Sequence, residues 1–278
     1  MSENSQSGTS PTITRHDHNA GQVIGRHRHA FHQLVYVSTG VLAVQTGEAS
    51  WVASSAQAMW IPADTWHQHR VYGPSCVHTI GFAPDDAPLP PASPTVVFVE
   101  PLLRELLIAR SDPDLSGPES DRLQAVMRDR LRRSHVQPLT LPTPQDPRLV
   151  RACGLATENL AELRTVTWLA RQSGVGERTL SRLFRTEFGM TYPQWRTTTR
   201  VFHAMIQLAE GATVTETGRR CGWATTSAFI DTFTRTIGQT PGNYRALACG
   251  IPRSSPAREH AGGRPRTPLG GVVGWPLS

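Results

Sequence analysis

Thr167-Trp-Leu-Ala-Arg-Gln-Ser-Gly-Val-Gly-Glu-Arg-Thr-Leu-Ser-Arg-Leu-Phe184 is the stretch that decides how the C-terminal half of this chain folds. Ala170 is small enough to let a second helix cross closely over the first, and Gly174 tolerates the left-handed backbone that ends a helix. Val175 and Leu180 can fill the small core between the two helices. The spacing therefore predicts a helix-turn-helix unit, whose second helix enters the major groove of DNA.

Polar side chains gather on the side of this second helix that would face solvent. Such groups donate hydrogen bonds to base edges and phosphates, as DNA recognition requires. The expected DNA contacts from this helix are Glu177, Arg178, Thr179, Ser181, Arg182 and Arg185. One such pattern is a weak signal, because any helical pair joined by a glycine turn imitates it.

The same arrangement returns further along the chain. Gly218 takes the place of the small residue, Gly222 takes the turn and Trp223 fills the core. Thr225 or Thr226 caps the following helix. The residues expected to face inward are Phe229, Ile230 and Phe233. The expected DNA contacts are Thr225, Thr226, Ser227, Asp231 and Arg235.

Residues 192–210 lie between the two units and carry apolar side chains at helical spacing. A helix of that length spans about 27 Å, and successive major grooves on one face of B-DNA lie about 34 Å apart. One stiff helix would therefore hold two DNA readers near the pitch of DNA. The competing interpretation is a structural helical bundle, in which Arg178 and Arg182 are ordinary solvated side chains.

The segment from about residue 147 to 245 resembles the DNA-binding domain of AraC/XylS transcription regulators. The resemblance rests on the runs Phe184-Arg-Thr-Glu-Phe-Gly-Met190, Trp195-Arg-Thr-Thr-Thr-Arg200 and Gly238-Gln-Thr-Pro-Gly-Asn-Tyr-Arg245. It implies that the first recognition helix is the main base reader, through Arg178, Ser181 and Arg182. Thr217-Gly218 stands where the family usually has Ile-Ala, and Asp231 stands where many members carry a basic residue. Both departures imply weaker DNA binding by the second unit.

Short apolar runs between about residues 15 and 83, punctuated by Gly40, Gly47 and Pro62, predict strands of a barrel or sandwich. Gln33-Leu-Val-Tyr-Val37 and Val41-Leu-Ala-Val44 are expected to be two of these strands. Residues 83–94 hold five prolines and predict a loop. Helices are expected next, around residues 102–107 and over 119–133.

Histidines give this half its chemistry. His27, His29 and Gln33 share odd parity and would project from one face of a strand, and His67 could join them from another strand. Three imidazoles and a side-chain oxygen can hold a divalent transition metal. The pattern resembles the double motif of cupins, with Gln33 replacing the usual Glu. A small-molecule pocket and a purely hydrogen-bonding role stay open as alternatives. The histidines expected to be exposed are His16, His18, His32 and His69.

Composition sets wider bounds. The formal net charge of +6 and the pI of about 9.8 favour a polyanionic partner, although every basic residue is Arg and none is Lys. The four cysteines are scattered, which is typical of reduced thiols in the cytoplasm. No apolar run is long enough to predict a membrane span.

The expected fold class is α+β, with an N-terminal cupin-like β-barrel, a helical linker segment and a C-terminal all-α domain carrying two helix-turn-helix units. The expected boundaries are a disordered arm at 1–14, a cupin-like sensor domain at 15–95, a helical dimerisation or covering segment at 96–135, a linker at 136–146, the AraC-type DNA-binding domain at 147–247 and a disordered tail at 248–278.

The expected function is sequence-specific, DNA-binding transcriptional regulation in the cytoplasm, without enzymatic activity. The expected partners are double-stranded DNA, a second copy of the chain, RNA polymerase and a small-molecule effector, but no membrane. The one cofactor suggested is a divalent transition metal in the cupin-like domain. The alternative is a cupin metalloenzyme of dioxygenase or isomerase type fused to a DNA-binding domain. The effector, the operator, the direction of regulation and the role of the tail stay open.

Overall fold

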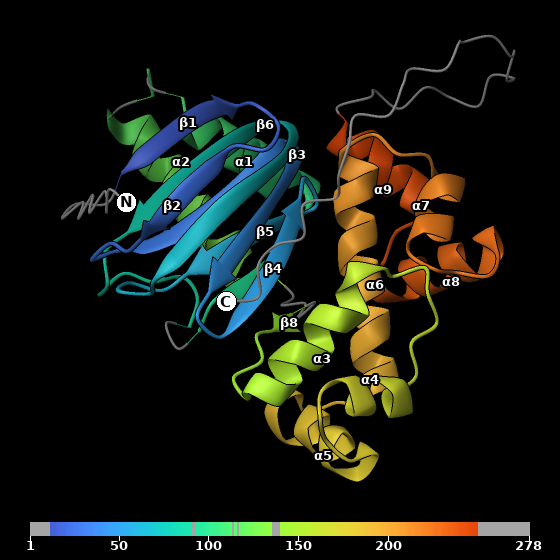
Figure 1. Ribbon diagram of the computed structural model, residues 1–278. Helices are drawn as coiled ribbons and strands as arrows, with labels where there is room; N and C mark the ends of the chain where they lie inside the picture. Colours follow the sequence, from blue (N-terminus) through green and yellow to red (C-terminus); the bar gives the residue numbers. More distant parts are fainter. Residues whose placement is uncertain (1–11, 91–92, 113, 116, 135–139, 250–278) are drawn as a thin grey trace, which may run out of the picture.

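The computed structural model describes residues 12–90, 93–112, 114–115, 117–134 and 140–249, in a strand-rich N-terminal half and a helical C-terminal half (Figure 1). This arrangement confirms the predicted α+β class. Within the described ranges, no helix combines the length and the hydropathy that crossing a membrane requires. The predicted tail, from residue 250 onward, lies outside the described residues, as do residues 1–11 of the predicted arm.

The N-terminal half is an eight-stranded sheet in which all pairings are antiparallel. The strands are β1 (Ile13–His18), β2 (Val23–His27), β3 (His32–Thr46), β4 (Ala49–Ser54), β5 (Gln57–Ile61), β6 (His67–Phe82), β7 (Thr95–Phe98) and β8 (Leu141–Pro142). The main path runs β1-β6-β3-β4-β8, with β2 also paired to β6 and β5 paired to β3 and β7. The long central strands β3 and β6 therefore organise the whole sheet.

The two strands predicted on either side of Gly40 are one continuous strand, β3. Gly40 has a φ of +79°, and the register with β6 shifts between Val37 and Thr39 and again between Thr39 and Val41, so this segment forms a bulge rather than a turn. A β-carbon on Gly40 would overlap the side chain of Ser75. Val35 and Val37 before the bulge share an apolar core with Leu42 and Val44 after it, so the bulge reverses which parity faces that core.

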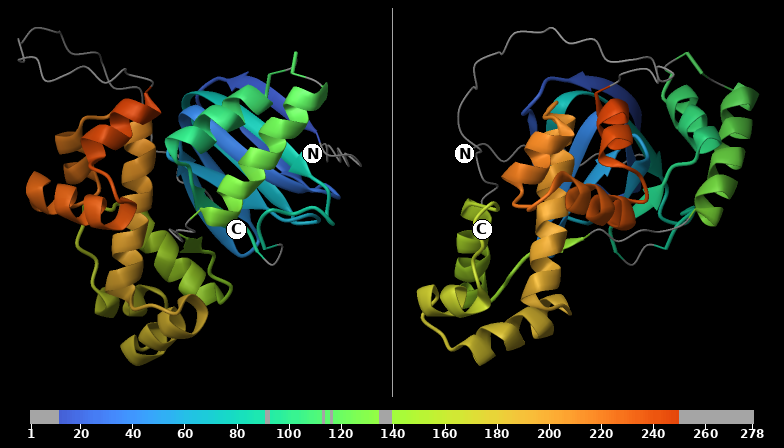
Figure 2. Two further views of the ribbon diagram at one scale, coloured as in Figure 1. Left: turned by 180° about the vertical axis from the view of Figure 1, so that it is seen from behind. Right: turned by 90° about the vertical axis from the view of Figure 1, so that its right-hand side faces the viewer.

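Two helices, α1 (Pro101–Arg110) and α2 (Gly117–Arg133), cover the other face of the sheet (Figure 2). Leu103 and Leu107 of α1 and Met127 and Leu131 of α2 are almost fully buried in one apolar cluster with side chains of β3, β5 and β6. The predicted helices are thus present. The predicted arm is too long at its C-terminal end, because β1 begins at Ile13.

Seven helices build the described C-terminal half: α3 (Pro147–Glu158), α4 (Val166–Gln172), α5 (Glu177–Phe188), α6 (Tyr192–Ala209), α7 (Val214–Arg220), α8 (Thr226–Ile237) and α9 (Pro241–Ala248). The predicted spacer helix is α6, which begins with a capping box between Thr191 and Gln194. Side chains of α6, including Trp195 and Met205, are buried among residues of both helix-turn-helix units. One core therefore holds the two units together.

The two halves of the molecule are packed together directly. Val41, Ala43, Val52 and Leu141 of the sheet belong to the same apolar cluster as the core of the helical half. In Figure 1 the helices α6 and α9 lie between the sheet and the second pair of helices, α7 and α8. Part of the predicted linker is not a free connection, because residues 141–142 form β8 and pair with β4. The sheet therefore packs directly against the spacer helix α6.

Candidate DNA-reading surface and histidine site

The first helix-turn-helix unit consists of α4 and α5. Ala170 and Leu180 are buried where the two helices meet, and Gly174 in the turn has a φ of +70°, as the sequence predicted. Arg178 and Arg182 of α5 are exposed. Of the other predicted contacts, Arg185 is exposed, and Thr179 and Ser181 are half-buried. The polar side of α5 is therefore accessible to a duplex.

Glu177 differs from the other predicted contacts of α5 because it has a partner within the protein. The hydroxyl of Thr167 in α4 donates a hydrogen bond of 2.6 Å to its carboxylate. This bond joins the two helices of the unit at the first turn of α5. Helical spacing could not predict this pairing, because the partner lies on a different helix.

The second unit consists of α7 and α8, and it requires glycine at two positions, one in the turn and one within α7. Gly222 has a φ of +81°, and a β-carbon there would stand 2.3 Å from the carbonyl oxygen of Leu160. Gly218 lets the ring of Phe229 approach closely, since a β-carbon there would lie 3.1 Å from that ring. The departure from the family's alanine at position 218 thus has a packing reason. Thr225 is the cap of α8, and its side chain accepts from the Ala228 N–H.

The outer side of α8 differs from the prediction at one position. Ile230 is 38% exposed and does not join the core, whereas Phe229 and Phe233 are buried as expected. Asp231 forms an exposed ion pair of 3.3 Å with Arg235, one turn away. The pair neutralises part of the positive charge that α8 would offer to a phosphate. Of the other predicted contacts, Thr225 and Ser227 are exposed, and Thr226 is half-buried.

Trp223 supports the turn of the second unit from the side of the spacer helix. Its ring lies 4.8 Å from that of Phe229, and the guanidinium carbon of Arg200 in α6 stands 4.0 Å above it. Arg200 also donates to the carbonyl of Cys221. Burial lowers the pKa of Arg200 to about 10. The spacer helix is therefore joined to the second unit by a cation–π contact and a hydrogen bond.

The two reading helices occupy the part of the C-terminal half that is remote from the sheet. Figure 1 shows α5 at the lower end of α6 and α8 beside its middle, both away from the strands. The polar side chains predicted to contact DNA are exposed or half-buried, so the sheet does not cover them. The arrangement is that of two readers carried by one rigid helix.

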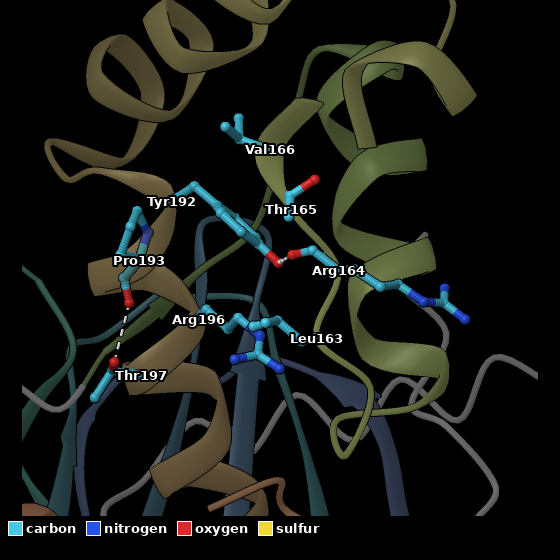
Figure 3. Close-up of a pocket in the computed structure, with 8 residues that line it drawn as sticks. All are labelled: Leu163, Arg164, Thr165, Val166, Tyr192, Pro193, Arg196 and Thr197. Carbon is cyan, nitrogen blue, oxygen red and sulfur yellow. Dashed lines mark hydrogen bonds between the residues drawn. The ribbon is translucent and has the colours of Figure 1, made fainter. Parts of the chain in front are cut away.

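A pocket opens in the same half, between the segment before α4 and the start of α6 (Figure 3). The hydroxyl of Tyr192 donates a hydrogen bond of 2.6 Å to the carbonyl of Arg164 across its floor. The guanidinium of Arg164 points away from the pocket in Figure 3 and lies over the ring of Trp168. The pocket borders the first helix-turn-helix unit and is separate from the histidines of the sheet.

Three of the predicted metal-binding residues are brought together in the sheet domain. His27, His29 and His67 each offer one ring nitrogen, and these three atoms lie within 4.8 Å of one another. His27 ends β2, His67 begins β6, and the two residues are paired across the strands. His29 lies in the segment between β2 and β3, so the prediction that one strand carries His27, His29 and Gln33 is wrong. The residues converge because β2 and β6 are neighbours.

Hydrogen bonds fix the orientation of all three rings. Nδ1 of His27, His29 and His67 lies 2.8, 2.6 and 2.8 Å from the backbone carbonyls of Gly25, Phe31 and Thr65. A carbonyl accepts only, so Nδ1 carries the proton and Nε2 keeps its lone pair. The Nε2 atoms of His29 and His67 are buried and have no hydrogen-bond partner among the described residues. Buried polar atoms are normally paired, so this arrangement is suited to a bound ligand.

Burial keeps the imidazoles of His29 and His67 neutral. Desolvation lowers the pKa of His67 to about 3, and it also lowers the pKa of His29. The nearby ring of His27 adds to both effects. Neutral imidazoles are the form that binds metals. Gln33 is buried, and its Oε1 has no hydrogen-bond partner within the described ranges, so the fourth predicted donor is also available.

Two histidines expected at the surface are buried. His32 is 4% exposed, stacks on Trp60 and accepts a hydrogen bond from the Ala63 N–H. His69 is 4% exposed and lies beside the triad formed by His27, His29 and His67. His16 is exposed as expected, and His18 is half-buried. Sequence alternation placed His32 on the face opposite Gln33, but it could not show that both faces of β3 are covered.

The C-terminal domain carries two helix-turn-helix units on one spacer helix. It packs against a sheet domain that holds a buried cluster of histidine nitrogens. These two features define a two-domain DNA-binding regulator. Comparison with known families identifies it further. Residues 11–134 match the AraC-like ligand binding domain, and residues 169–247 match a helix-turn-helix domain. The chain belongs to the AraC family of transcriptional regulators. It combines a ligand-binding domain with a DNA-binding domain.

Individual relatives agree with this assignment. The chain is 28% identical over 223 residues to the HTH-type transcriptional regulator NimR of Escherichia coli K12, covering 79% of this chain and 81% of NimR. It is 34% identical over 79 residues to the HTH-type transcriptional activator RhaR of Salmonella typhi, covering 28% of each chain.

Solved structures of related proteins were also found. The DNA-binding domain of AdpA in complex with a target DNA is 35% identical, with a TM-score of 0.34, and the match covers 37% of this chain and 92% of that one. Fatty-acid-bound ToxT from Vibrio cholerae is 10% identical, with a TM-score of 0.39, over 90% of this chain and 99% of that one.

Proposed function

We propose that this regulator responds to a divalent transition metal held by His27, His29 and His67, and that metal binding changes its affinity for operator DNA. The observation that carries the proposal is the convergence of three ring nitrogens within 4.8 Å. Each ring is held by a bond from its other nitrogen to a backbone carbonyl. Hydrogen bonds of this kind, made by the ring nitrogen that does not bind the ion, orient histidine ligands in metal sites.

The residues present fit such an ion. Three neutral imidazoles form a donor set for zinc, nickel, cobalt or copper. The bound ion would supply positive charge and a fixed coordination geometry, which draw β2, β6 and the segment carrying His29 together. Gln33 is a neutral amide rather than a carboxylate, which lowers the expected affinity for the metal but leaves the three imidazole donors in place.

The test is metal binding by the full-length protein after removal of metal with a chelator. Zinc and nickel should bind in a one-to-one ratio, raise the melting temperature and shift the Kd for operator DNA. His29→Ala should abolish all three effects, whereas the exposed His16→Ala should leave them unchanged. If wild-type protein shows no binding of either ion, or binds it without any change in DNA affinity, the metal-sensing proposal is wrong.

The same triad also suits a cupin metalloenzyme, since three protein ligands leave coordination positions free for a substrate. Oxygen consumption by the metal-loaded protein addresses this second candidate. Turnover that depends on His29 would favour catalysis in addition to regulation. Turnover that survives His29→Ala would dismiss it.

For the DNA side we propose that Arg178, Ser181 and Arg182 of α5 read bases and that α8 contributes less. Arg178 and Arg182 lie on the exposed side of α5 and form no ion pair with any described residue, whereas Asp231 partly neutralises α8. Arg–guanine contacts are the commonest specific base contacts. A protein with this function would act in the cytoplasm, and an activating role would add a contact with RNA polymerase.

We also propose that a second copy of the chain docks on α1 and α2. Leu102 of α1 and Val126 of α2 are 47% and 43% exposed, and neighbouring Phe98 is 40% exposed. An isologous contact would bury these side chains in both copies at once, and two copies would place four reading helices on one operator. Analytical ultracentrifugation should show a dimer that Leu102→Glu with Val126→Glu converts to a monomer. A monomeric wild type at high concentration would contradict this.

A further inference from the structure

His69 is a fourth buried histidine beside the triad, and it has no assigned role. The centroid of its ring lies 5.0 Å from that of His67 and 5.6 Å from that of His27. Its Nε2 atom is buried and has no hydrogen-bond partner in the part of the chain that the structure describes. A buried nitrogen left without a partner is costly, so this atom calls for a ligand in the same way as those of the triad.

The backbone holds His69 on the face that carries the cluster. His67 and His69 are two residues apart on β6, so their side chains point to the same side of the sheet. His69 is paired with Val44 of β3, whose side chain lies in the apolar core on that side. The residue thus stands on a central strand, next to the triad and shielded from water, which is a rigid position for a ligand.

We propose that His69 is the fourth protein ligand and that the centre is a four-imidazole site for zinc, nickel, cobalt or copper. This inference rests on the metal site proposed above. An imidazole nitrogen is a better donor for these ions than the amide oxygen of Gln33. Within the described part of the chain, no carboxylate belongs to the group of converging side chains. A set of neutral nitrogen donors disfavours magnesium, calcium and manganese, which prefer oxygen.

Coordination by His69 needs a small movement. The ring lies outside the tight group formed by the other three, so it must turn toward them when the ion binds. The terminal torsion of a histidine is broad, and its rotation is inexpensive. The alternative is that His69 does not bind the ion and its ring turns instead toward another buried nitrogen, such as Nδ1 of His18, which has no hydrogen-bond partner among the described residues. In that arrangement His69 would pack beside the three ligands without binding the ion itself.

X-ray absorption of the zinc-loaded, full-length protein counts imidazole ligands directly and separates these arrangements. Wild type should show four imidazoles, and Gln33→Ala should keep four. His69→Ala should show three and bind zinc at least about tenfold more weakly, because loss of even a residue that only orients a ligand costs roughly 10–100-fold in affinity. His78→Ala is the matched control, because His78 is buried in the same domain and is not a member of the group. His69→Gln keeps a polar side chain of similar size if the alanine variant does not fold.

The outcomes distinguish the two proposals. Three imidazoles in wild type, or a wild-type count and affinity in both His69 variants, would overturn the role of His69 while the triad stands. A loss of one ligand in Gln33→Ala with His69 variants unchanged would assign the fourth position to Gln33 instead. Wild-type protein that binds no zinc, nickel, cobalt or copper overturns the metal site as a whole.

Discussion

Gly73 of the sheet lies against the end of the spacer helix, so closely that a β-carbon on Gly73 would stand 2.8 Å from the carbonyl oxygen of Ala209. Gly73 belongs to β6, the strand that also carries His67 and His69, and Ala209 is the last residue of α6. The strand that supplies two histidines of the cluster therefore touches the helix that carries both DNA readers. This contact is a direct physical link between the two domains.

Replacing Gly73 with alanine should loosen the contact between the domains. The residue has a φ of +70°, so alanine costs about 1–2 kcal/mol for the left-handed backbone alone, and the overlap with Ala209 adds roughly 1–3 kcal/mol. Gly21→Ala is the control, because Gly21 has a φ of +81° and nothing within 4 Å of the added carbon. Urea unfolding measures both variants. Equal losses of unfolding free energy would show that the contact contributes nothing.

Arg182→Ala should weaken specific DNA binding. Loss of a base-reading arginine costs about 1–3 kcal/mol, which is about fivefold to 150-fold in Kd. Fluorescence anisotropy with operator and with random duplex gives the specificity ratio. Arg151→Ala, at an exposed position on α3, is the control for the loss of one positive charge. Equal operator affinity of wild type and Arg182→Ala would remove α5 from the role of main reader.

Glu177→Ala should act on stability more than on sequence recognition. The carboxylate accepts a 2.6 Å hydrogen bond from Thr167 of the neighbouring helix, and loss of such a bond costs roughly 0.5–1.5 kcal/mol of unfolding free energy. Thr167→Ala should give a similar loss, and the double variant should lose less than the sum. A strong change in the preferred operator bases, with stability unaffected, would instead make Glu177 a base reader.

Gly222→Ala should disrupt the second helix-turn-helix unit. The added carbon would lie 2.3 Å from the backbone oxygen of Leu160, which cannot move without shifting the segment before α4. Gly238 has nearly the same backbone, with a φ of +79°, and open space around it. We expect Gly222→Ala to lower the melting temperature well beyond Gly238→Ala. Identical melting temperatures would mean that the turn tolerates a side chain.

Mild acid should destabilise the helical half through His203 of α6. Burial lowers the pKa of His203 to about 4 in the folded protein, against about 6.5 in an unfolded chain. Between these values the unfolded state binds more protons, so the contribution to stability is complete above pH 6.5 and is lost as the pH falls toward 4. His203→Gln should flatten the fall in urea midpoint between pH 7 and pH 5. An unchanged slope in that variant would exclude His203 as a source.

Local sequence was sufficient for the helical half because its signals act over a few residues. Apolar side chains at helical spacing, a threonine cap at Thr225 and left-handed glycines at Gly174 and Gly222 each act within one or two turns. The same is true of the spacer helix, whose capping box joins neighbours three residues apart. The prediction that Ile230 faces inward was wrong because periodicity marks the apolar face of a helix but not how far the core extends around that face.

The sequence alone determined that the chain has two reading units, one stiff connector and a strand domain rich in histidine, since composition and periodicity carry that information. Only the tertiary structure decided that His32 and His69 are buried, that the bulge at Gly40 reverses the faces of β3, and that β6 meets α6 at Gly73. Alternation along a strand says which side chains share a face. What covers that face depends on segments far away in the chain, whose approach is set by packing of the whole molecule.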